Sequence, residues 1–395
     1  MSSVSAVPIA DFCRTGSGTT PSREKLGTYY GGTIPWVKSG ELREGLITAT
    51  EESVTELAMK ETSLKLAPKG ALLVAMYGAT VGRVARLGVA ATTNQAICHV
   101  VPDCKLADEQ YVFHALQAKA PELVAKGVGG AQPNISQGTI RDTKIYLPSL
   151  PEQRRIAAIL DQADALRRLR RQSLEYVAGL PSAIFREMFG DLVANDGGFE
   201  AGIVSDLVGG FDTGKNLAPA PSDETTINRV LKVSAVTSGA FDGNESKPLP
   251  DSYTPPKAHF INKGDLLFSR ANTSALIGAT ALVKTEIANI VLPDKIWRFQ
   301  WREGNESIFV HHLFQSLPMR REISRRASGT SGSMKNIGKE KVLGIKIGVP
   351  GANARREFER KIETADQAYN EIQRACLNSD ALFTSLQHRA FRGEL

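Results

Sequence analysis

The sequence has few cysteines, no long hydrophobic run and no secretory start. Its four cysteines, Cys13, Cys98, Cys104 and Cys376, are scattered over 395 residues without a C-x-x-C pair, which disfavours a disulfide framework or a zinc ribbon. Cys98, His99 and Cys104 match no standard metal-ligand spacing. No stretch approaches the ~18 apolar residues of a membrane span, and the N-terminus lacks a basic start followed by an apolar core. We therefore expect a soluble, cytoplasmic protein with reduced thiols and no metal.

The sequence also lacks a recognisable catalytic motif. GGFDTGKN at 209–216 has the spacing of a phosphate-binding loop, but Asn216 replaces the hydroxyl that would bind magnesium. LAPAPS follows it where a helix should begin, so a strand-to-loop turn is expected. The single Pro-Pro pair stands in TPPK, which is not the order of an adenine methylase motif, and no nuclease-type Glu-x-Lys follows a Pro-Asp pair at useful distance. His114 and His312 occupy equivalent places in two similar segments, which indicates a structural role. The sequence favours a binding protein.

The charge balance favours a polyanionic partner. There are 48 Lys and Arg residues against 42 Asp and Glu, for a net charge of +6, and the sequence pI is about 9.0. A basic balance of this size is compatible with nucleic-acid binding without requiring it.

The chain contains a long internal repeat. WVKSGEL is echoed by VLKVSAV, which places Lys38 opposite Lys232, and PNIS is echoed by KNIG, which places Asn134 opposite Asn336. The offset grows from 194 to 202 positions along the chain, as small loop insertions would cause. The landmarks keep their order, so we expect one structural unit to occur twice.

Each copy is followed by a predicted long helix. Apolar residues recur at spacings of three and four, which is typical of a core-facing or coiled-coil helix. In the first helix they are Ile156, Ile159, Ala163, Leu166, Val177, Leu180 and Ile184, and in the second Phe358, Ile362, Ala365, Tyr369, Ile372, Cys376, Phe383 and Leu386. The matching tails FREMFGDL and HRAFRGEL follow, with Phe189 opposite Phe391.

These stripes are narrow, so we expect the two helices to pack against each other as an antiparallel coiled coil. The alternative is that each helix packs on its own globular half. Arg170 falls on the stripe and is expected to weaken packing there. The first helix, taken from Glu152 to Ala178, has 27 residues, or roughly 40 Å at ~1.5 Å per residue.

The sequence predicts an α/β fold for the two globular halves. Val- and Ile-rich runs between glycine-rich turns predict strands in ALLVAMY, AICHVV, DLLF and IANIVL. Segments 108–120 and 307–317 predict helices, the first capped by Asp108. The predicted fold class is α/β, with two tandem halves that have strand-rich cores, two long helices and pseudo-two-fold symmetry.

Six segments together resemble one family. GSGTTPSREKLGTYYGGTIPWVKSGEL, PKGALLVAMYGATVGRVARLG, TTNQAI, QPNIS, LPSLPEQRRIAAILDQAD and AFRGEL are similar to the DNA specificity subunit of type I restriction-modification systems. The resemblance implies target recognition domains at 1–150 and 193–351, and helical spacers at 151–192 and 352–395. The second half departs from the pattern at SRANTSALIGAT, LPDKIW and GANARREFERKI, as expected if the two domains read different bases.

The resemblance also implies a function and partners. The subunit would do no chemistry and bind no cofactor; each recognition domain would read one half of a bipartite, asymmetric site on double-stranded DNA. The helices would set the spacing of the half-sites and dock two methylation subunits, which use S-adenosylmethionine, while a restriction subunit uses ATP and magnesium. A stand-alone nuclease or methyltransferase, or a protein-binding scaffold, are the alternatives.

Candidate DNA contacts follow from residue chemistry. Arg pairs with guanine, Asn and Gln pair with adenine, and Lys, Arg and small hydroxyls bind phosphates. By these criteria the candidates are Lys38, Tyr77, Thr80, Arg83, Gln132, Asn134, Lys232, Arg270, Asn272, Thr273, Lys335 and Asn336. A cluster that could follow the phosphate backbone comprises Arg320, Arg321, Arg325 and Arg326. Candidates for partner docking on the helices are Gln153, Arg154, Ile156, Ile159, Phe358, Ile362 and Tyr369.

Overall fold

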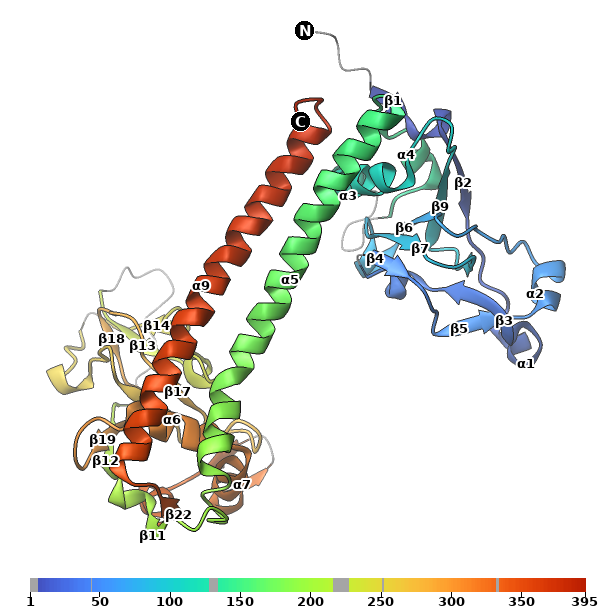
Figure 1. Cartoon of the computed structure of the whole chain (residues 1–395). Helices are drawn as coiled ribbons and strands as arrows, with labels where there is room; N and C mark the ends of the chain where they lie inside the picture. Colours follow the sequence, from blue (N-terminus) through green and yellow to red (C-terminus); the bar gives the residue numbers. More distant parts are fainter. Residues whose placement is uncertain (1–5, 44, 128–133, 216–226, 251, 332–333) are drawn as a thin grey trace. The chain divides into compact units, whose positions relative to one another are not determined.

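The chain forms two compact units. The computed structural model describes residues 6–43, 45–127, 134–215, 227–250, 252–331 and 334–395. Unit 1 comprises Met1–Gln172 and Arg374–Leu395, and unit 2 comprises Ser173–Gln373. Each unit therefore contains a strand-rich part and a portion of both long helices (Figure 1).

The core of unit 1 is a five-stranded sheet in the order β2-β9-β6-β7-β4. Its strands are β2 (Cys13–Ser17), β4 (Gly45–Ile47), β6 (Leu72–Ala75), β7 (Val84–Leu87) and β9 (Ile97–Pro102). All neighbours are antiparallel except the parallel pair of β4 and β7. Every residue of β6 is buried, which explains its unbroken apolar sequence. The strands predicted from ALLVAMY and AICHVV are confirmed as β6 and β9.

Smaller sheets and helices complete the strand-rich part of unit 1. The sheets are β5-β3-β8 and β1-β10. Their strands are β1 (Ala6–Pro8), β3 (Tyr30–Val37), β5 (Glu52–Val54), β8 (Thr92–Thr93) and β10 (Lys144–Tyr146). The helices are α1 (Leu26–Tyr29), α2 (Glu56–Glu61), α3 (Glu109–Ala125) and α4 (Gln137–Arg141). The predicted cap of α3 is confirmed, because the Asp108 carboxylate accepts bonds from the backbone N–H groups of Gln110 and Tyr111 at 3.1 Å.

Unit 2 has a four-stranded, fully antiparallel main sheet in the order β12-β19-β15-β17. Its strands are β12 (Val208–Thr213), β15 (Leu266–Ser269), β17 (Thr280–Leu282) and β19 (Ile296–Trp301). The smaller sheets are β14-β13-β18, β16-β21-β20 and β11-β22. Their strands are β11 (Glu200–Ile203), β13 (Arg229–Leu231), β14 (Ser246–Pro248), β16 (Ala271–Asn272), β18 (Ile290–Val291), β20 (Ser328–Ser331), β21 (Met334–Asn336) and β22 (Lys346–Val349). The helices are α6 (Ser307–Gln315), α7 (Leu317–Arg326) and α8 (Lys339–Leu343).

The sequence repeat is also a repeat of topology. The strand order β2-β9-β6-β7 in unit 1 corresponds to β12-β19-β15-β17 in unit 2. Likewise β5-β3-β8 corresponds to β14-β13-β18, and β1-β10 to β11-β22. The registers agree as well, since Ser17 pairs with Cys98 and Thr213 pairs with Trp297. The predicted α/β class with two strand-rich regions and two long helices is confirmed.

The long helices are α5 (Leu150–Phe189), of 40 residues, and α9 (Ala352–Ala390), of 39. The first helix is longer than the 27 residues counted from Glu152 to Ala178, because α5 continues through Pro181. A proline inside a helix removes one backbone hydrogen bond and costs about 3 kcal/mol. The burial of Phe185 and Phe189 beyond it offsets that cost, since both side chains are at most 4% exposed.

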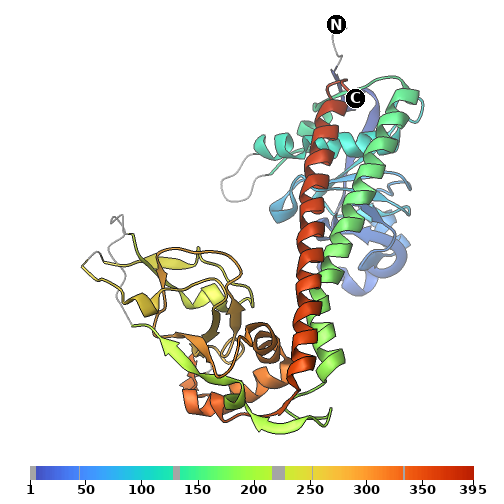
Figure 2. The same cartoon turned by 60° about the vertical axis from the view of Figure 1, so that its left-hand side comes forward.

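In unit 1 the start of α5 runs antiparallel to the end of α9, as predicted. The Arg155 guanidinium donates to the carbonyl of Leu395 at 2.6 Å, and Arg170 donates to the carbonyl of Ala375 at 2.9 Å. Both views show these two helix portions side by side (Figures 1 and 2). Because the residue numbers rise on one helix as they fall on the other, the pairing is antiparallel.

The apolar stripe of α5 was partly misassigned. Leu166 is 42% exposed and Ile159 is half-buried, whereas Leu160 is fully buried. A spacing of three and four fits two adjacent faces of one helix, and the structure buries the face that contains Leu160. Arg167 and Arg170 follow Leu160 on the buried face.

Polar and aromatic partners accommodate the two arginines in the helix pair. Arg170 also donates to the Ser379 hydroxyl, and the Arg167 guanidinium lies 4.3 Å from the centroid of the Phe383 ring. The expected weakening of packing at Arg170 is therefore countered by hydrogen bonds that satisfy its charge.

The end of one long helix packs into the core of each unit. In unit 2 the ring centroid of Phe185 lies 5.4 Å from Phe358, and that of Phe189 lies 5.3 Å from Phe309. In unit 1 Phe391 lies 5.5 Å from Tyr111. The C-terminal ends of α5 and α9 thus both pack aromatic side chains into a core, α5 in unit 2 and α9 in unit 1. The division into recognition domains and spacers stays a prediction about function, because the compact units divide both long helices.

Candidate nucleic-acid interface

The first candidate surface lies on the connection between β6 and β7. Residues 77–83 include a short 3-10 turn at Gly78–Thr80, and Gly78 and Gly82 have φ of +73° and +81°. A Cβ at Gly82 would lie 2.7 Å from the side chain of Val124 on α3, so the loop is held close to that helix. Tyr77 is 41% exposed and Arg83 is also exposed.

Asn134 belongs to the same surface although it lies far along the chain. The backbone N–H of Ile135 donates to the carbonyl of Met76 at 2.9 Å, and the Ile135 side chain is buried. The exposed Asn134 is therefore held next to the segment that begins at Tyr77. Thr80 is half-buried, with its hydroxyl 3.4 Å from the Tyr77 carbonyl. Gln132 lies outside the described residues.

The equivalent surface in unit 2 has the same construction. The N–H of Ile337 donates to the carbonyl of Arg270 at 3.1 Å. β16 and β21 pair so that Ala271 faces Asn336 and Asn272 faces Lys335. The structure thus brings together four of the candidates predicted in the second half, from two distant segments.

Several side chains on this second surface have internal partners. The Arg270 Nε donates to the carbonyl of Asp294 at 2.7 Å, and its guanidinium lies 6.0 Å from the Trp297 ring centroid. The Asn272 side-chain oxygen accepts from the N–H of Thr273 at 2.8 Å. These contacts fix the orientation of Arg270 and Asn272.

Lys38 and Lys232 are equivalent residues that both bind carboxylates. The Lys38 Nζ lies 2.7 Å from Glu51 and 3.0 Å from Glu52, and these hydrogen bonds raise the pKa of Lys38. The Lys232 Nζ lies 3.5 Å from Glu245. Such exposed ion pairs are weak, at about 0–1 kcal/mol, so a phosphate could compete for either lysine.

The arginine cluster on α7 has a buried side and an exposed side. Arg320 donates to the carbonyl of Ala275 at 2.7 Å, and burial lowers its pKa. Arg326 donates to Glu322 and to the carbonyls of Lys341 and Gly344. Arg321 and Arg325 are exposed. Arg320 and Arg326 thus also hold unit 2 together, and contact of the four arginines with a phosphate backbone stays a prediction.

Four of the predicted docking residues are covered by the chain itself. Gln153, Ile156, Phe358 and Ile362 are at most 3% exposed. The Gln153 amide accepts from the N–H of Asp108 at 2.8 Å and donates to the carbonyls of Leu106 and Pro148. These residues position the helices, whereas Arg154 is exposed and Ile159 and Tyr369 are half-buried.

The described residues show no arrangement for chemistry at the sites that the sequence raised. The segment resembling a phosphate-binding loop is strand β12 up to Thr213. His114 and His312 are held inside their units, where burial lowers the pKa of His114, and that of His312 to about 4. Within the described ranges, no three His, Cys, Asp or Glu side chains are grouped to hold a metal ion.

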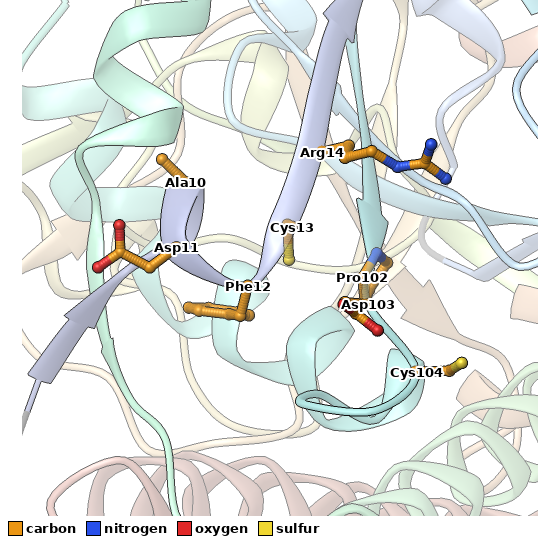
Figure 3. A pocket seen from close by; sticks show the side chains of 8 residues that line it. All are labelled: Ala10, Asp11, Phe12, Cys13, Arg14, Pro102, Asp103 and Cys104. Atoms are coloured by element: carbon orange, nitrogen blue, oxygen red, sulfur yellow. The ribbon is translucent and has the colours of Figure 1, made fainter.

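A pocket of about 380 Å³ contains two of the cysteines, Cys13 and Cys104. Burial raises the pKa of the Cys13 thiol to about 12, so it is a neutral, poorly nucleophilic group. The side chains of Asp11 and Arg14 point away from each other there (Figure 3). Asp11, Arg14 and Asp103 also line this pocket.

Sequence reasoning missed Gln137 and Lys339. Each lies three residues beyond a candidate asparagine and 202 positions from the other. Their side chains contact the first strand of each main sheet. The repeat itself was the signal that could have singled them out.

Two strand-rich units with the same topology and a pair of long helices define the class: a duplicated α/β protein with two long helices. Solved structures share this fold at low identity. A type I restriction-modification S subunit from M. genitalium has a TM-score of 0.57 and 13% identity, over 99% of this chain and 97% of that one. A chain described under complex assembly and conformational transition of the type I R-M system has a TM-score of 0.63 and 16% identity, over 99% and 98%.

Sequence comparisons point to one group of proteins. Residues 1–177 match the model of the type I restriction modification DNA specificity domain. The chain is 30% identical to the MjaIX specificity subunit of Methanocaldococcus jannaschii over 46% of this chain and 43% of that protein. It is 23% identical to the EcoKI specificity subunit of Escherichia coli K12 over 92% and 82%. The match thus spans less than half of the first relative and most of the second. The chain is thus similar in sequence to specificity subunits of type I restriction-modification systems, and its residues 1–177 match their DNA specificity domain.

The described part of the chain has no helix with the length and apolar character needed to cross a membrane.

Proposed function

We propose that this chain is the non-catalytic, sequence-specific DNA-binding subunit of a type I restriction-modification complex. The strand-rich part of each unit reads one half of a bipartite, asymmetric site on double-stranded DNA. The helices α5 and α9 set the spacing between the half-sites. The proposal rests on the family and on the construction of the two candidate surfaces.

The observation that carries the proposal is the repeated surface. In both units a segment with an asparagine is tied by one backbone hydrogen bond to the end of a central strand, at Ile135–Met76 and Ile337–Arg270. Amide side chains pair with adenine, and arginine pairs with guanine. The framework is shared while the side chains differ, since Tyr77 and Thr80 stand in unit 1 and Asn272 and Lys335 in unit 2. This combination suits two half-sites of different sequence.

The partners follow from the same family. Two methylation subunits that use S-adenosylmethionine would dock on the charged, exposed faces of the helices, which include Arg154. A restriction subunit would supply translocation with ATP and magnesium. The complex would act in the cytoplasm, where the DNA is.

The test is to express the chain with a candidate methylation subunit, purify the complex by a tag on this chain, and map the methylated adenines on plasmid DNA. Co-purification and one split motif would support the proposal. Nuclease or methyltransferase activity of the isolated chain would instead reveal an enzyme, and a complex that fails to shift duplex DNA would indicate a protein scaffold.

A further inference from the structure

Gln137 holds the Asn134 segment against the main sheet of unit 1. Its side-chain oxygen accepts from the Ser17 hydroxyl at 2.8 Å, and its Nε2 donates to the Thr15 hydroxyl at 2.9 Å. Gln137 is the first residue of α4, and Thr15 and Ser17 lie on β2. The glutamine thus uses both atoms of its amide on one strand.

Lys339 holds the corresponding segment in unit 2. It is the first residue of α8, and its Nζ donates to the carbonyl of Phe211 on β12 at 2.7 Å. The same ammonium group lies 5.8 Å from the centroid of the Trp297 ring. A different side chain therefore makes the same connection.

The two connections end at the same strand position. Thr15 pairs with Val100 in the register of β2 and β9, and Phe211 pairs with Phe299 in the register of β12 and β19. Val100 and Phe299 are equivalent by the register that aligns Cys98 with Trp297. Gln137 binds side-chain hydroxyls of β2 and Lys339 binds a backbone carbonyl of β12, yet both contacts lie at the same position of the sheet.

The segment between the fixed points is short. It is tied to β6 through Ile135 and to β2 through Gln137, and β9 lies between these two strands in the sheet. The segment thus passes over β9, and neighbouring strands lie about 4.8 Å apart. Without the Gln137 contact the buried side chains of Ile135 and Ile140 would still anchor the segment, but the start of α4 would lose its polar contact with β2 and Asn134 its fixed direction.

We propose that Gln137 and Lys339 are positioning residues for DNA readout, each for its own half-site. This inference rests on the proposed function. Neither side chain needs to touch DNA: each fixes the start of the short helix behind the candidate asparagine, and so the place of Asn134 or Asn336. Loss of either contact should relax sequence discrimination in one half-site and leave the other unchanged.

The experiment uses the full complex with its methylation subunits and plasmids that carry the mapped wild-type motif with single base changes in either half. Gln137→Leu removes both hydrogen bonds and should lower discrimination in one half about ten-fold, the effect of about one hydrogen bond. Lys339→Leu should do the same in the other half. Gln137→Glu should restore discrimination, because its carboxylate accepts from both hydroxyls.

Matched controls lie on the same short helices. Arg141→Gln on α4 and Lys341→Gln on α8 leave the contacts to β2 and β12 intact, since the Lys341 Nζ donates to the carbonyl of Arg326 instead. Both should keep full discrimination. If Gln137→Leu does not fold, Thr15→Val removes one hydroxyl of the same contact and gives the same test.

Equal losses in both halves, unchanged discrimination, or an equal effect of Arg141→Gln would overturn the inference. A wild-type complex that leaves no motif would refute the proposed function instead, so the two failures are distinguishable.

Discussion

Arg325 and Arg326 are neighbours in α7, yet their side chains have different tasks. The Arg325 side chain is 71% exposed, whereas that of Arg326 is 25% exposed. Both bind Glu322, but Arg326 also donates to two backbone carbonyls at 3.1 Å. Arg325 is therefore the arginine of this pair that is available to bind a phosphate.

Substitution of each arginine should therefore have a different effect. Arg325→Ala should weaken binding of the complex to all duplexes and lower the salt slope by about 1, since one phosphate contact is lost. Arg326→Ala should lower the free energy of unfolding by about 1 kcal/mol, because the hydrogen bonds to Glu322 and to the carbonyls of Lys341 and Gly344 are lost. Titrations at two salt concentrations and thermal melts measure both. If Arg325→Ala altered only sequence preference, the phosphate assignment would be wrong.

The ionisation of Glu322 makes the stability of unit 2 depend on pH. Hydrogen bonds from Arg325 and Arg326 lower the pKa of Glu322 from 4.5 to about 2. A carboxyl with a lowered folded pKa contributes stability that is full above its unfolded pKa near 4.5 and is lost as the pH falls toward 2. The melting temperature of the wild type should exceed that of Glu322→Gln at pH 5, and the difference should shrink between pH 4.5 and 2. A constant difference over that range would contradict the assignment.

At the scale of elements, the helix pair shows what periodicity can and cannot predict. The second helix was predicted well, since Phe358, Ile362, Cys376 and Phe383 are all buried. On α5 the sequence offered Ile159 or Leu160 as the next apolar residue after Ile156, and spacing alone could not choose. The bonds of Arg170 to Ala375 and Ser379 depend on the facing helix and have no local signal.

The polar contact at Arg170 should add little net stability. Burying a guanidinium costs free energy that its hydrogen bonds only balance, so Arg170→Leu with Ser379→Ala should be neutral or stabilising by up to about 2 kcal/mol. Phe383→Ala should cost about 3–5 kcal/mol, because it removes a buried ring. Thermal and urea unfolding of the full chain measure both. A double variant that loses as much stability as Phe383→Ala would show that the polar contact is essential.

The helices are proposed to act as a ruler, and their pairing dictates how to test this. Removal of one heptad from α5 together with the facing heptad from α9 keeps the buried faces aligned. Each helix becomes about 10 Å shorter at ~1.5 Å per residue, so the gap in the methylated motif should shrink by about three base pairs. A methylation map with an unchanged gap would refute the ruler.

At the scale of the whole molecule, the duplication was visible in the sequence. The packing of the end of α9 against the first half of the chain was not. Equal landmarks at a slowly growing offset predicted two copies. The packing of Phe391 against Tyr111 joins residues 280 positions apart, and no periodicity reports such a contact. The candidate surfaces were found by residue chemistry, whereas the fixed position of Asn134 needed the hydrogen bond between Ile135 and Met76.

The central claim is that one chain presents two different readers of DNA. The most direct measurement is a map of methylated adenines left on DNA by the complex of this chain with its methylation subunits. We expect one split motif, with two unlike halves separated by a gap of fixed length. Methylation without a motif, or a single continuous motif that one unit alone can specify, would contradict the claim.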